Sequence, residues 1–585
     1  MKRKFVQIAA LCLAAALLLA SGGRKASAAS AGSGDRIIRV GLHHDGSYGT
    51  GSLEGVNLEN DVGSGFRFGY YDASNRFIEL GYTGETKISL AETMNVYYGT
   101  YGGYTSYHTA AVSSVAVGEY HLQLPGTYAS FIEAYAAASP YPGGFAAYIG
   151  GAYYARVGNY TTSDQARAAL ASLGTAAELC WTSEYGVNAV ITGTSTILFQ
   201  YDDLGRGTGL GVEPISVSGE KCVTWCKYYR YNGGFRFERI NGGKLTVVNM
   251  VGLEDYVKGV LPYEMADSWP LEALKAQAVA ARSYTLSLGT KHSAQHFDIC
   301  DNIDCQVYQG RNKAGATTDA ATDQTAGQVA LYDGKPIQAF FYSSNGGASE
   351  SVSNVWGSNQ SLYPYLTGKA DPYESSLDLK NYWERSFTSA QIISKALKGY
   401  SVSGAIVSAA VTAYTDVGNP KTITFTDSAG KNYTVSSAKV LSGLGLPSFR
   451  FGFAGGGAGQ PAPAAPSTPS GTVTINGNST VNSTSGLYVI DGNGNISALG
   501  GDVYVVTDSG TSQLDQAGGQ DQGQSAGGEW SSSATVVNGS ITFAGRGSGH
   551  NIGLSQYGAK AMAEQGRSYL EILQFYYTGI TVGYM

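Results

Sequence analysis

Hydrophobic and polar positions alternate in short runs over the first part of the chain, a pattern that predicts strands rather than helices. Ile37–Leu42, Phe66–Tyr71 and Phe77–Tyr82 are such runs, and Gly and Asn residues separate them. Residues 36–117 are therefore predicted to form a β-rich region. With helical segments further along, the predicted fold class is α+β and multidomain.

One segment has clear helical spacing. Leu271, Leu274, Ala278 and Ala281 recur at intervals of three and four, which predicts a helix over residues 270–289. Pro270 suits the first turn of that helix, where its missing N–H costs nothing. Upstream, a strand over 242–250 is expected to lead through a hairpin-like turn into residues 253–256.

Residues 118–202 alternate between the two patterns. A strand at Glu119–Leu124, helices at Tyr128–Ala138 and Ser163–Leu173, and a last strand near Ile197–Phe199 predict a β-α-β-β-α-β order. The run Tyr-Ala-Arg-Val-Gly-Asn-Tyr at 154–160, followed by Thr-Thr-Ser-Asp-Gln-Ala-Arg, resembles a SPOR domain. That resemblance implies binding to peptidoglycan glycan strands stripped of stem peptides. The alternative is a small α+β spacer.

Composition narrows the class of protein. The 585 residues suggest three to five units, and 80 Gly without a strict Gly-X-Y period exclude collagen. The net charge of −7 and a pI of about 5.6 argue against a basic nucleic-acid binder, so no nucleic-acid partner is expected. Low charge (14%) with 42 Tyr favours an extracytoplasmic protein.

The N-terminus has the layout of an export signal. Lys2, Arg3 and Lys4 precede an apolar run to Ala20, and Ala26-Ser27-Ala28 fits a cleavage site. Residues 1–28 are predicted to be a signal peptide, with an uncleaved signal anchor as the alternative. The chain is expected to be extracytoplasmic: secreted, associated with the cell wall, or anchored in the membrane through this segment.

The longest motif lies between residues 253 and 284. It reads Leu-Glu-Asp-Tyr-Val-Lys-Gly-Val-Leu-Pro-Tyr-Glu-Met, and after Ser268-Trp269-Pro270 it continues as Leu-Glu-Ala-Leu-Lys-Ala-Gln-Ala-Val-Ala-Ala-Arg-Ser-Tyr. A second motif, Gly-Ser-Gly-His-Asn-Ile-Gly-Leu-Ser-Gln-Tyr-Gly-Ala, covers 547–559. Together they resemble the stage II sporulation protein D (SpoIID/LytB) family. The resemblance covers 205–453 and resumes at 541–585, and residues 454–540 are predicted to be a low-complexity linker with a small β insertion.

The resemblance implies a lytic transglycosylase whose catalytic residue is Glu264, in the Pro-x-Glu-Met motif. Breaking a glycosidic bond requires a carboxylic acid that protonates the leaving oxygen. A glutamate flanked by Tyr263, Met265 and Trp269 is expected to be partly desolvated, which favours the protonated acid. In lytic cleavage the sugar's own 6-hydroxyl attacks, so one carboxylate serves first as acid and then as base. The alternative role for Glu264 is a helix cap.

The resemblance also implies substrate-binding residues. Lys275 and Arg282 lie seven residues apart and share a helical face. The remaining substrate-binding candidates are Tyr342, Ser343, His550, Gln556 and Tyr557. A family element that often reads Tyr-Phe-His-Ser-Thr-Ser-Gly-Gly is Phe-Phe-Tyr-Ser-Ser-Asn-Gly-Gly at 340–347, so Phe340 and Tyr342 depart from the pattern and put catalysis in question.

Some family members bind zinc through one His and two Cys, which implies His296, Cys300 and Cys305 as metal ligands here. His292 competes with His296, and a fourth ligand from Asp304, His292, water or substrate would complete a tetrahedron. The zinc is expected to be structural, because the acid–base chemistry at Glu264 requires no cofactor. A Cys300–Cys305 disulfide or two free thiols are the alternatives.

The predicted function is cleavage of amidase-denuded peptidoglycan strands with formation of 1,6-anhydro-muramic ends, in sporulation or wall remodelling. The alternative is a non-enzymatic amidase enhancer that binds peptidoglycan, since relatives of the LytB type carry that description. Expected partners are glycan strands and an N-acetylmuramoyl-L-alanine amidase. A zinc hydrolase is disfavoured, because no His-Glu-x-x-His set accompanies the His/Cys cluster.

Overall fold

The computed structural model describes residues 36–46, 49–289, 291–374, 377, 381–454 and 530–585, together with six short strands between 473 and 513. Within these residues no helix combines the length and apolar character needed to cross a membrane. The predicted signal segment 1–28 lies outside the described residues. The chain divides into two compact units, one made of the residues up to 264 plus 288–319, the other of 265–287 plus 320–585.

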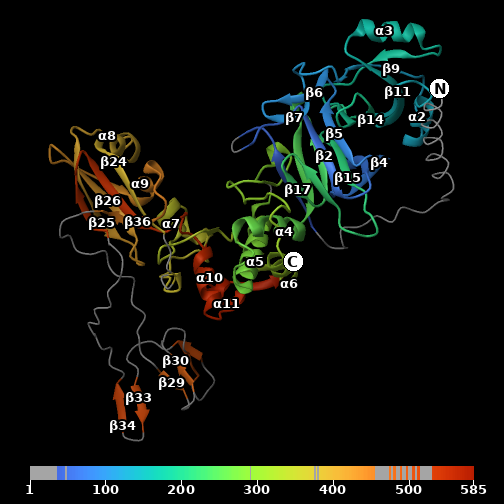
Figure 1. The fold of residues 1–585 in the computed structure, drawn as a ribbon. Helices are drawn as coiled ribbons and strands as arrows, with labels where there is room; N and C mark the ends of the chain where they lie inside the picture. Colours follow the sequence, from blue (N-terminus) through green and yellow to red (C-terminus); the bar gives the residue numbers. More distant parts are fainter. Residues whose placement is uncertain are drawn as a thin grey trace. The chain divides into compact units, whose positions relative to one another are not determined.

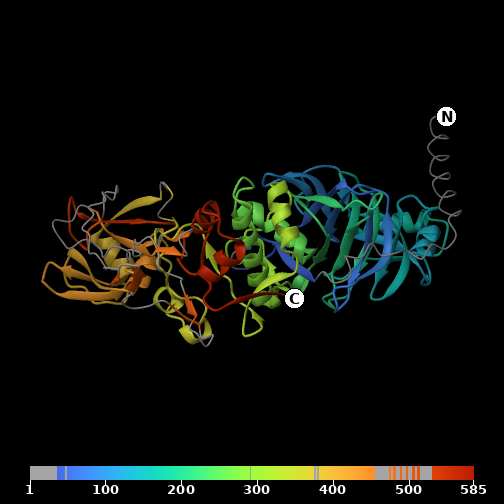
Figure 2. The ribbon, with the colours of Figure 1, turned by 90° about the horizontal axis from the view of Figure 1, so that it is seen from below.

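The first unit contains two large sheets and a small one (Figure 1; Figure 2 shows the same blue and green strands turned by 90°). The seven-stranded sheet has the order β20 (Ile299–Cys300), β1 (Ile37–His43), β19 (Thr246–Gly252), β18 (Gly234–Glu238), β15 (Leu210–Pro214), β3 (Phe66–Tyr71) and β4 (Phe77–Thr83). The three runs that alternate at the start of the chain are thus strands, as predicted. The small sheet consists of β7 (Tyr104–His108), β6 (Val96–Tyr101) and β8 (Ala116–Val117).

The ten-stranded sheet contains the segment predicted to resemble a SPOR domain. Its order is β12 (Glu178–Cys180), β9 (Tyr120–Gln123), β11 (Ala152–Tyr160), β10 (Gly144–Ile149), β14 (Ile197–Asp202), β13 (Val187–Ile191), β5 (Lys87–Glu92), β2 (Gly55–Val62), β16 (Val223–Cys226) and β17 (Tyr229–Tyr231). Helices α2 (Phe131–Ala138) and α3 (Ser163–Ser172) complete a β-α-β-β-α-β unit from β9 to β12.

The observed β-α-β-β-α-β arrangement differs from the expected one in its last strand. The strand near Ile197–Phe199 exists as β14, but it pairs in parallel with β10, and β12 closes the far side by pairing with β9. β12 has only three residues, too few for an alternating pattern to reveal it in the sequence. The four strands continue into the ten-stranded sheet, and the assignment to SPOR stays a prediction.

The second unit contains several smaller sheets and most of the helices. The sheets are β22 (Lys335–Pro336), β21 (Gln328–Tyr332) and β38 (Thr581–Tyr584); β23 (Phe341–Tyr342) and β37 (Leu554–Ser555); β24 (Tyr382–Thr388), β36 (Ser540–Arg546) and β28 (Arg450–Phe453); and β27 (Asn432–Ser436), β26 (Pro420–Asp427), β25 (Ile406–Tyr414) and β35 (Ser533–Thr535). The helices include α7 (Val352–Trp356), α9 (Ser437–Leu444), α10 (Gln556–Glu564) and α11 (Tyr569–Tyr576). α11 begins with the capping box Ser568–Glu571.

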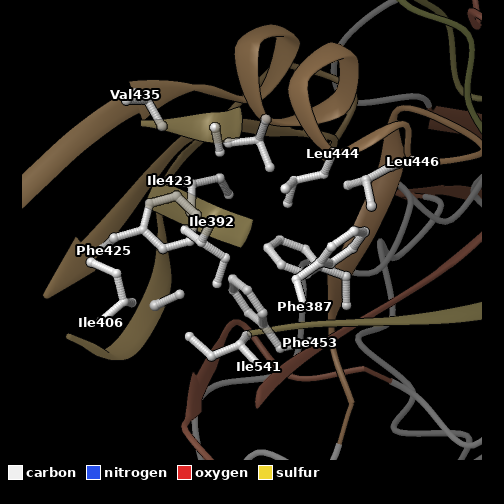
Figure 3. Packing of buried hydrophobic residues seen from close by; sticks show 14 of the residues in the cluster. Phe387, Ile392, Ile406, Ile423, Phe425, Val435, Leu444, Leu446, Phe453 and Ile541 are labelled. Atoms are coloured by element: carbon white, nitrogen blue, oxygen red, sulfur yellow. The ribbon is translucent and has the colours of Figure 1, made fainter. Parts of the chain in front are cut away.

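The last two of these sheets enclose a hydrophobic core (Figure 3). Phe387, Phe453 and Ile541 come from the strands of one sheet, and Ile423 and Phe425 come from the other. All five are at most 9% exposed. Between 473 and 513, three hairpins follow one another: β29 (Val473–Ile475) with β30 (Ser479–Val481), β31 (Tyr488–Ile490) with β32 (Ile496–Ala498), and β33 (Tyr504–Thr507) with β34 (Gly510–Gln513).

The coarse prediction of a multidomain, strand-rich α+β protein is confirmed. The helix predicted over 270–289 is present as α5 (Leu271–Leu288), and α6 (Ala316–Gln324) follows it. The hairpin-like lead into 253–256 is wrong: these residues open a helix, α4 (Leu253–Glu264). Gly259 and Pro262 both have low helix propensity, so the sequence alone does not predict α4.

Candidate functional site

Glu264 is the last residue of α4, in the first unit. Most of the helix is buried, through residues such as Tyr256, Val260 and Leu261, whereas Glu264 itself is half-buried. Its Oε1 accepts a hydrogen bond of 3.3 Å from the backbone N–H of Val307. The carboxylate is therefore oriented by the main chain of a neighbouring segment and still retains some exposure.

A close contact along α4 requires glycine at position 259. A Cβ added to Gly259 would lie 2.4 Å from Cε2 of Tyr308, far inside van der Waals contact. Tyr308 cannot retreat easily, because its hydroxyl donates to Oδ1 of Asn249 at 2.7 Å and its ring stacks on Tyr256 with centroids 4.9 Å apart. Gly259 thus lets the helix approach the segment that contains Val307.

Pro262 creates a second requirement in the last turn of α4. A proline has no N–H, so it cannot donate to the carbonyl oxygen of Lys258 four residues earlier. Nη1 of Arg311 donates to that oxygen instead, at 3.2 Å. Two further hydrogen bonds, of 2.8 and 2.6 Å, hold the guanidinium on the carboxylate of Asp319. The helix end that presents Glu264 is therefore supported from outside the helix.

Lys275 and Arg282 lie in the second unit, on α5. Nζ of Lys275 forms an ion pair of 2.7 Å with Glu272, and 15% of the Lys275 side chain is exposed. Arg282 is fully buried, and its Nη1 donates to the carbonyl oxygen of Gln328 at 2.9 Å. Of the two, Lys275 retains the surface that contact with a substrate needs.

The second unit brings the 340–347 segment and the C-terminal motif together, although more than 200 residues separate them. β23 pairs in parallel with β37, so that Tyr342 lies opposite Ser555. The N–H of Tyr557 donates to the carbonyl oxygen of Ser343 at 3.0 Å, and Gln556 is the buried first residue of α10. Tyr342 and Ser343 thus lie beside Ser555, Gln556 and Tyr557, at the end of one short sheet.

Tyr342 and His550 lie in an aromatic cluster of this unit, with ring centroids 5.1 Å apart. Tyr342 is only 5% exposed, and its hydroxyl has no hydrogen-bond partner among the described residues. Nδ1 of His550 accepts the N–H of Ile552 at 3.1 Å, and burial lowers the pKa of His550 to about 4. His550 is therefore neutral at ordinary pH. Trp356, 42% exposed, packs its ring 5.3 Å from that of His550.

Glu374 connects the two segments through a buried polar network. Its carboxylate accepts hydrogen bonds from the hydroxyls of Ser344 and Ser555, each at 2.5 Å, and from the backbone N–H groups of Asn345 and Gly346, each at 2.9 Å. Burial raises the pKa of Glu374. One carboxylate thus connects the 340–347 segment to Ser555 of the C-terminal motif.

Four potential metal ligands converge in the first unit. One ligand atom from each of His292, Cys300, Asp304 and Cys305 lies within 4.8 Å of all the others. Nε2 of His292 is 3.3 Å from Sγ of Cys305 and 3.4 Å from Oδ2 of Asp304, and Sγ of Cys300 is 3.9 Å from the same oxygen. These separations suit the corners of a tetrahedron around a zinc ion, and two Cys, one His and one carboxylate are donors that zinc accepts.

The histidine of this cluster is His292 rather than His296. Nδ1 of His296 is 2.7 Å from Oε1 of Glu238, and His296 has a left-handed backbone conformation (φ 63°) that ends a short 3₁₀ turn. His292 begins that turn and is 8% exposed. The candidate ligand set therefore replaces His296 with His292 and adds Asp304 as the fourth member. Spacing along the chain favours neither histidine.

Comparison with known proteins places this site in a family. Residues 241–332 match the SpoIID family model, described as stage II sporulation protein. The match includes Glu264, Lys275, Arg282 and the four clustered metal ligands, whereas Tyr342 and the C-terminal motif lie outside it. This match confirms the resemblance of the motif at 253–284 to the SpoIID/LytB family.

Three curated relatives extend the comparison. The chain is 34% identical over 335 residues (56% of its length) to the amidase enhancer of Bacillus subtilis strain 168. It is 24% identical over 351 residues (57%) to stage II sporulation protein D of the same strain, covering 75% of that protein. An uncharacterized protein of Brachyspira hyodysenteriae is 42% identical over 139 residues, 24% of this chain. The chain spans 40% of the amidase enhancer's length and 37% of the Brachyspira protein's.

Proposed function

We propose that the chain is a peptidoglycan lytic transglycosylase that cleaves glycan strands from which an amidase has removed the stem peptides. The observation that carries the proposal is the placement of Glu264. Within the segment that matches the family model, one half-buried carboxylate stands at a helix end that Gly259, Tyr308 and Arg311 hold in place. Rigid placement of one acid is what cleavage without a second carboxylate requires.

In the proposed reaction, the protonated carboxyl of Glu264 donates its proton to the glycosidic oxygen as the bond to C1 of the muramic residue breaks. The resulting carboxylate then accepts the proton of that residue's own 6-hydroxyl as O6 bonds to C1. The products are a free 4-hydroxyl on one fragment and a 1,6-anhydro ring on the other, and no water is consumed. Lys275 is proposed to contact the substrate. Buried Arg282 is proposed to hold helix α5 in position through its hydrogen bond to the carbonyl oxygen of Gln328.

The metal cluster has a structural part in this proposal. His292, Cys300, Asp304 and Cys305 would hold a zinc ion through four protein ligands, which leaves no open position for substrate. Such an ion would crosslink the 292–305 loop. Val307, whose N–H binds Glu264, follows Cys305 by two residues, so an ordered loop helps to orient the catalytic carboxylate.

The proposed setting is outside the cytoplasm, in the cell wall, where sporulation or wall remodelling would supply the substrate. The predicted export signal supports the location. The names of the relatives, stage II sporulation protein D and amidase enhancer, support the sporulation setting and an amidase as partner.

A second candidate function is non-enzymatic enhancement of an amidase. The 34% identity to a protein named amidase enhancer favours it. So does the enclosure of Tyr342, because a phenol that is 5% exposed does not reach a substrate.

The experiment that separates the two functions uses the purified full chain and amidase-treated glycan strands. Wild type is expected to release fragments with 1,6-anhydro ends, detected by mass spectrometry, and Glu264→Gln to release none. Glu254→Gln, on the same helix, is the matched control and is expected to remain active. Absence of anhydro products from wild type, combined with faster peptide release when amidase is added, would favour the enhancer instead.

A further inference from the structure

Two arginines and a tyrosine form a row across the three-stranded sheet of the second unit. In the order β24, β36, β28, Tyr382 lies directly opposite Arg546, and Arg546 lies directly opposite Arg450. Residues opposite one another on paired strands project from the same face. The next residues along, Trp383, Gly545 and Phe451, belong to the other face, where Phe387, Phe453 and Ile541 fill the core (Figure 3).

Within the part of the chain that the structure describes, neither guanidinium of this row has a carboxylate within ion-pairing distance. Nη1 of Arg450 donates to Oδ1 of the neutral amide Asn419 at 3.1 Å. The Nδ2 of that amide donates to Oε2 of Glu350 at 3.0 Å, so Asn419 lies between Arg450 and this carboxylate. Glu384, on the same face of β24 as Tyr382, accepts the hydroxyl of Tyr382 at 2.7 Å. Arg39 and Arg311, by contrast, each have a close acidic partner: Asp298 lies 2.6 Å from Arg39 and Asp319 lies 2.6 Å from Arg311.

Two like charges at directly opposite positions destabilise a sheet when nothing neutralises them. The burial of Arg450 adds to this cost, since it lowers the pKa of the guanidinium. An anion bound between the two side chains would remove the repulsion. A guanidinium presents a planar fork of N–H donors that fits a carboxylate with two parallel hydrogen bonds. Beside the pair, Tyr382 is 41% exposed and offers a ring against which a sugar can pack.

We propose that Arg450 and Arg546 bind a carboxylate of the glycan substrate, namely the lactyl carboxylate of a muramic residue that has lost its stem peptide. The identity of this ligand rests on the proposed function. Hydrolysis of the amide between the lactyl group and the peptide leaves a free carboxylate on each denuded muramic residue, whereas an intact residue has a neutral amide there. The arginine pair thus distinguishes strands that an amidase has processed from strands that it has not.

Binding measurements on the full chain with the Glu264→Gln substitution test this proposal, because that chain is expected to leave the strands intact. The probes are peptide-free glycan strands and the same strands with their carboxylates methyl-esterified. We expect the unesterified strands to bind at least about tenfold more tightly, the loss typical of removing a charged hydrogen bond. Arg450→Gln and Arg546→Gln are each expected to abolish this preference.

Arg385→Gln is the matched control. Arg385 is also on β24 but projects from the opposite face to Tyr382. Its Nη1 donates to the carbonyl oxygen of Glu384. That variant is expected to keep the preference for free carboxylates. Arg450→Lys keeps the positive charge but lacks the planar guanidinium, and it is expected to retain part of the preference for free carboxylates. It serves as the test if Arg450→Gln does not fold. An unchanged preference in folded Arg546→Gln would overturn the proposal.

A phosphate-containing wall polymer is the other source of anions. Inorganic phosphate at millimolar concentration is expected to displace the strands only weakly. If it displaces them fully, and the arginine variants abolish phosphate binding, the site is a phosphate site and the carboxylate assignment is wrong. The proposed function is tested independently. If wild type makes anhydro products but binds esterified and free strands equally, only the arginine site is refuted. If binding depends on the free carboxylate but no cleavage occurs, only the proposed reaction is refuted.

Discussion

Arg311 donates a hydrogen bond of 3.2 Å to the carbonyl oxygen of Lys258, the oxygen that Pro262 leaves without its usual helical donor. The proline in the Pro-x-Glu-Met motif has no N–H to donate to that oxygen, and a guanidinium from a distant segment donates to it. This relationship links the position of Glu264, the proposed catalytic residue, to residues 311 and 319, which the motif does not contain.

Replacing Arg311 with Met is expected to lower the free energy of unfolding by about 1–3 kcal/mol, because a charged hydrogen bond to a helix carbonyl and the pair with Asp319 are both lost. In a Pro262→Ala background, the introduced alanine has an N–H that can donate to the carbonyl oxygen of Lys258, so the same substitution should cost about 1 kcal/mol less. Denaturant unfolding of the four proteins measures this coupling. Equal costs in both backgrounds would contradict it.

Gly259→Ala is expected to destabilise the protein by about 1–3 kcal/mol, because the new methyl group would collide with the immobilised ring of Tyr308. Helix propensity alone predicts the opposite, a gain of about 1 kcal/mol. Gly84→Ala is the control, since an added Cβ there meets no atom within 4 Å. Thermal unfolding of both variants gives the sign, and a stabilised Gly259→Ala would refute the close contact.

Zinc content distinguishes the two histidines. Purified wild type is expected to contain about one zinc ion per chain by elemental analysis, His292→Ala and Cys300→Ser to contain far less, and His296→Ala to match wild type. A metal-free wild type with a Cys300–Cys305 disulfide, detected as two thiols unreactive to alkylation, would favour the disulfide alternative. Loss of zinc from His296→Ala alone would restore the ligand set first expected from the sequence.

The stability of the second unit should depend on pH through His550. Its pKa in the folded protein is about 4, below the ordinary value of 6.5, because the ring is buried. Between these values the unfolded chain binds a proton that the folded chain does not, so stability falls as pH decreases from 6.5 toward 4. Unfolding of wild type and His550→Gln across this range should show a steeper decline for wild type; parallel curves would exclude the contribution.

Sequence patterns located several of the regular elements, and the family resemblance supplied Glu264 as the catalytic candidate, but neither indicated the residues that support it. The 3.6-residue spacing of Leu271, Leu274 and Ala278 was sufficient for α5. α4 was hidden because its glycine and proline are explained only by Tyr308 and Arg311, which lie in a segment much further along the chain. A pattern within a helix contains no information about such a partner.

In the candidate site, too, some features could be predicted from the sequence and others only from the structure. The choice between His292 and His296 depends on how a 3₁₀ turn orients each ring, and the chain spacing to Cys300 does not determine that. The arginine pair depends on strand register, because Arg450 and Arg546 become neighbours only when β28 pairs with β36. Residues brought together by sheet pairing over long separations are visible only once the fold is known.

Cleavage in water labelled with heavy oxygen tests the central claim most directly. If Glu264 directs the 6-hydroxyl onto C1, wild type acting on amidase-treated strands yields anhydro-ended fragments with no label, and Glu264→Gln yields no fragments. Labelled reducing ends would show that water attacks instead and would contradict the account of Glu264 as a lone acid and base.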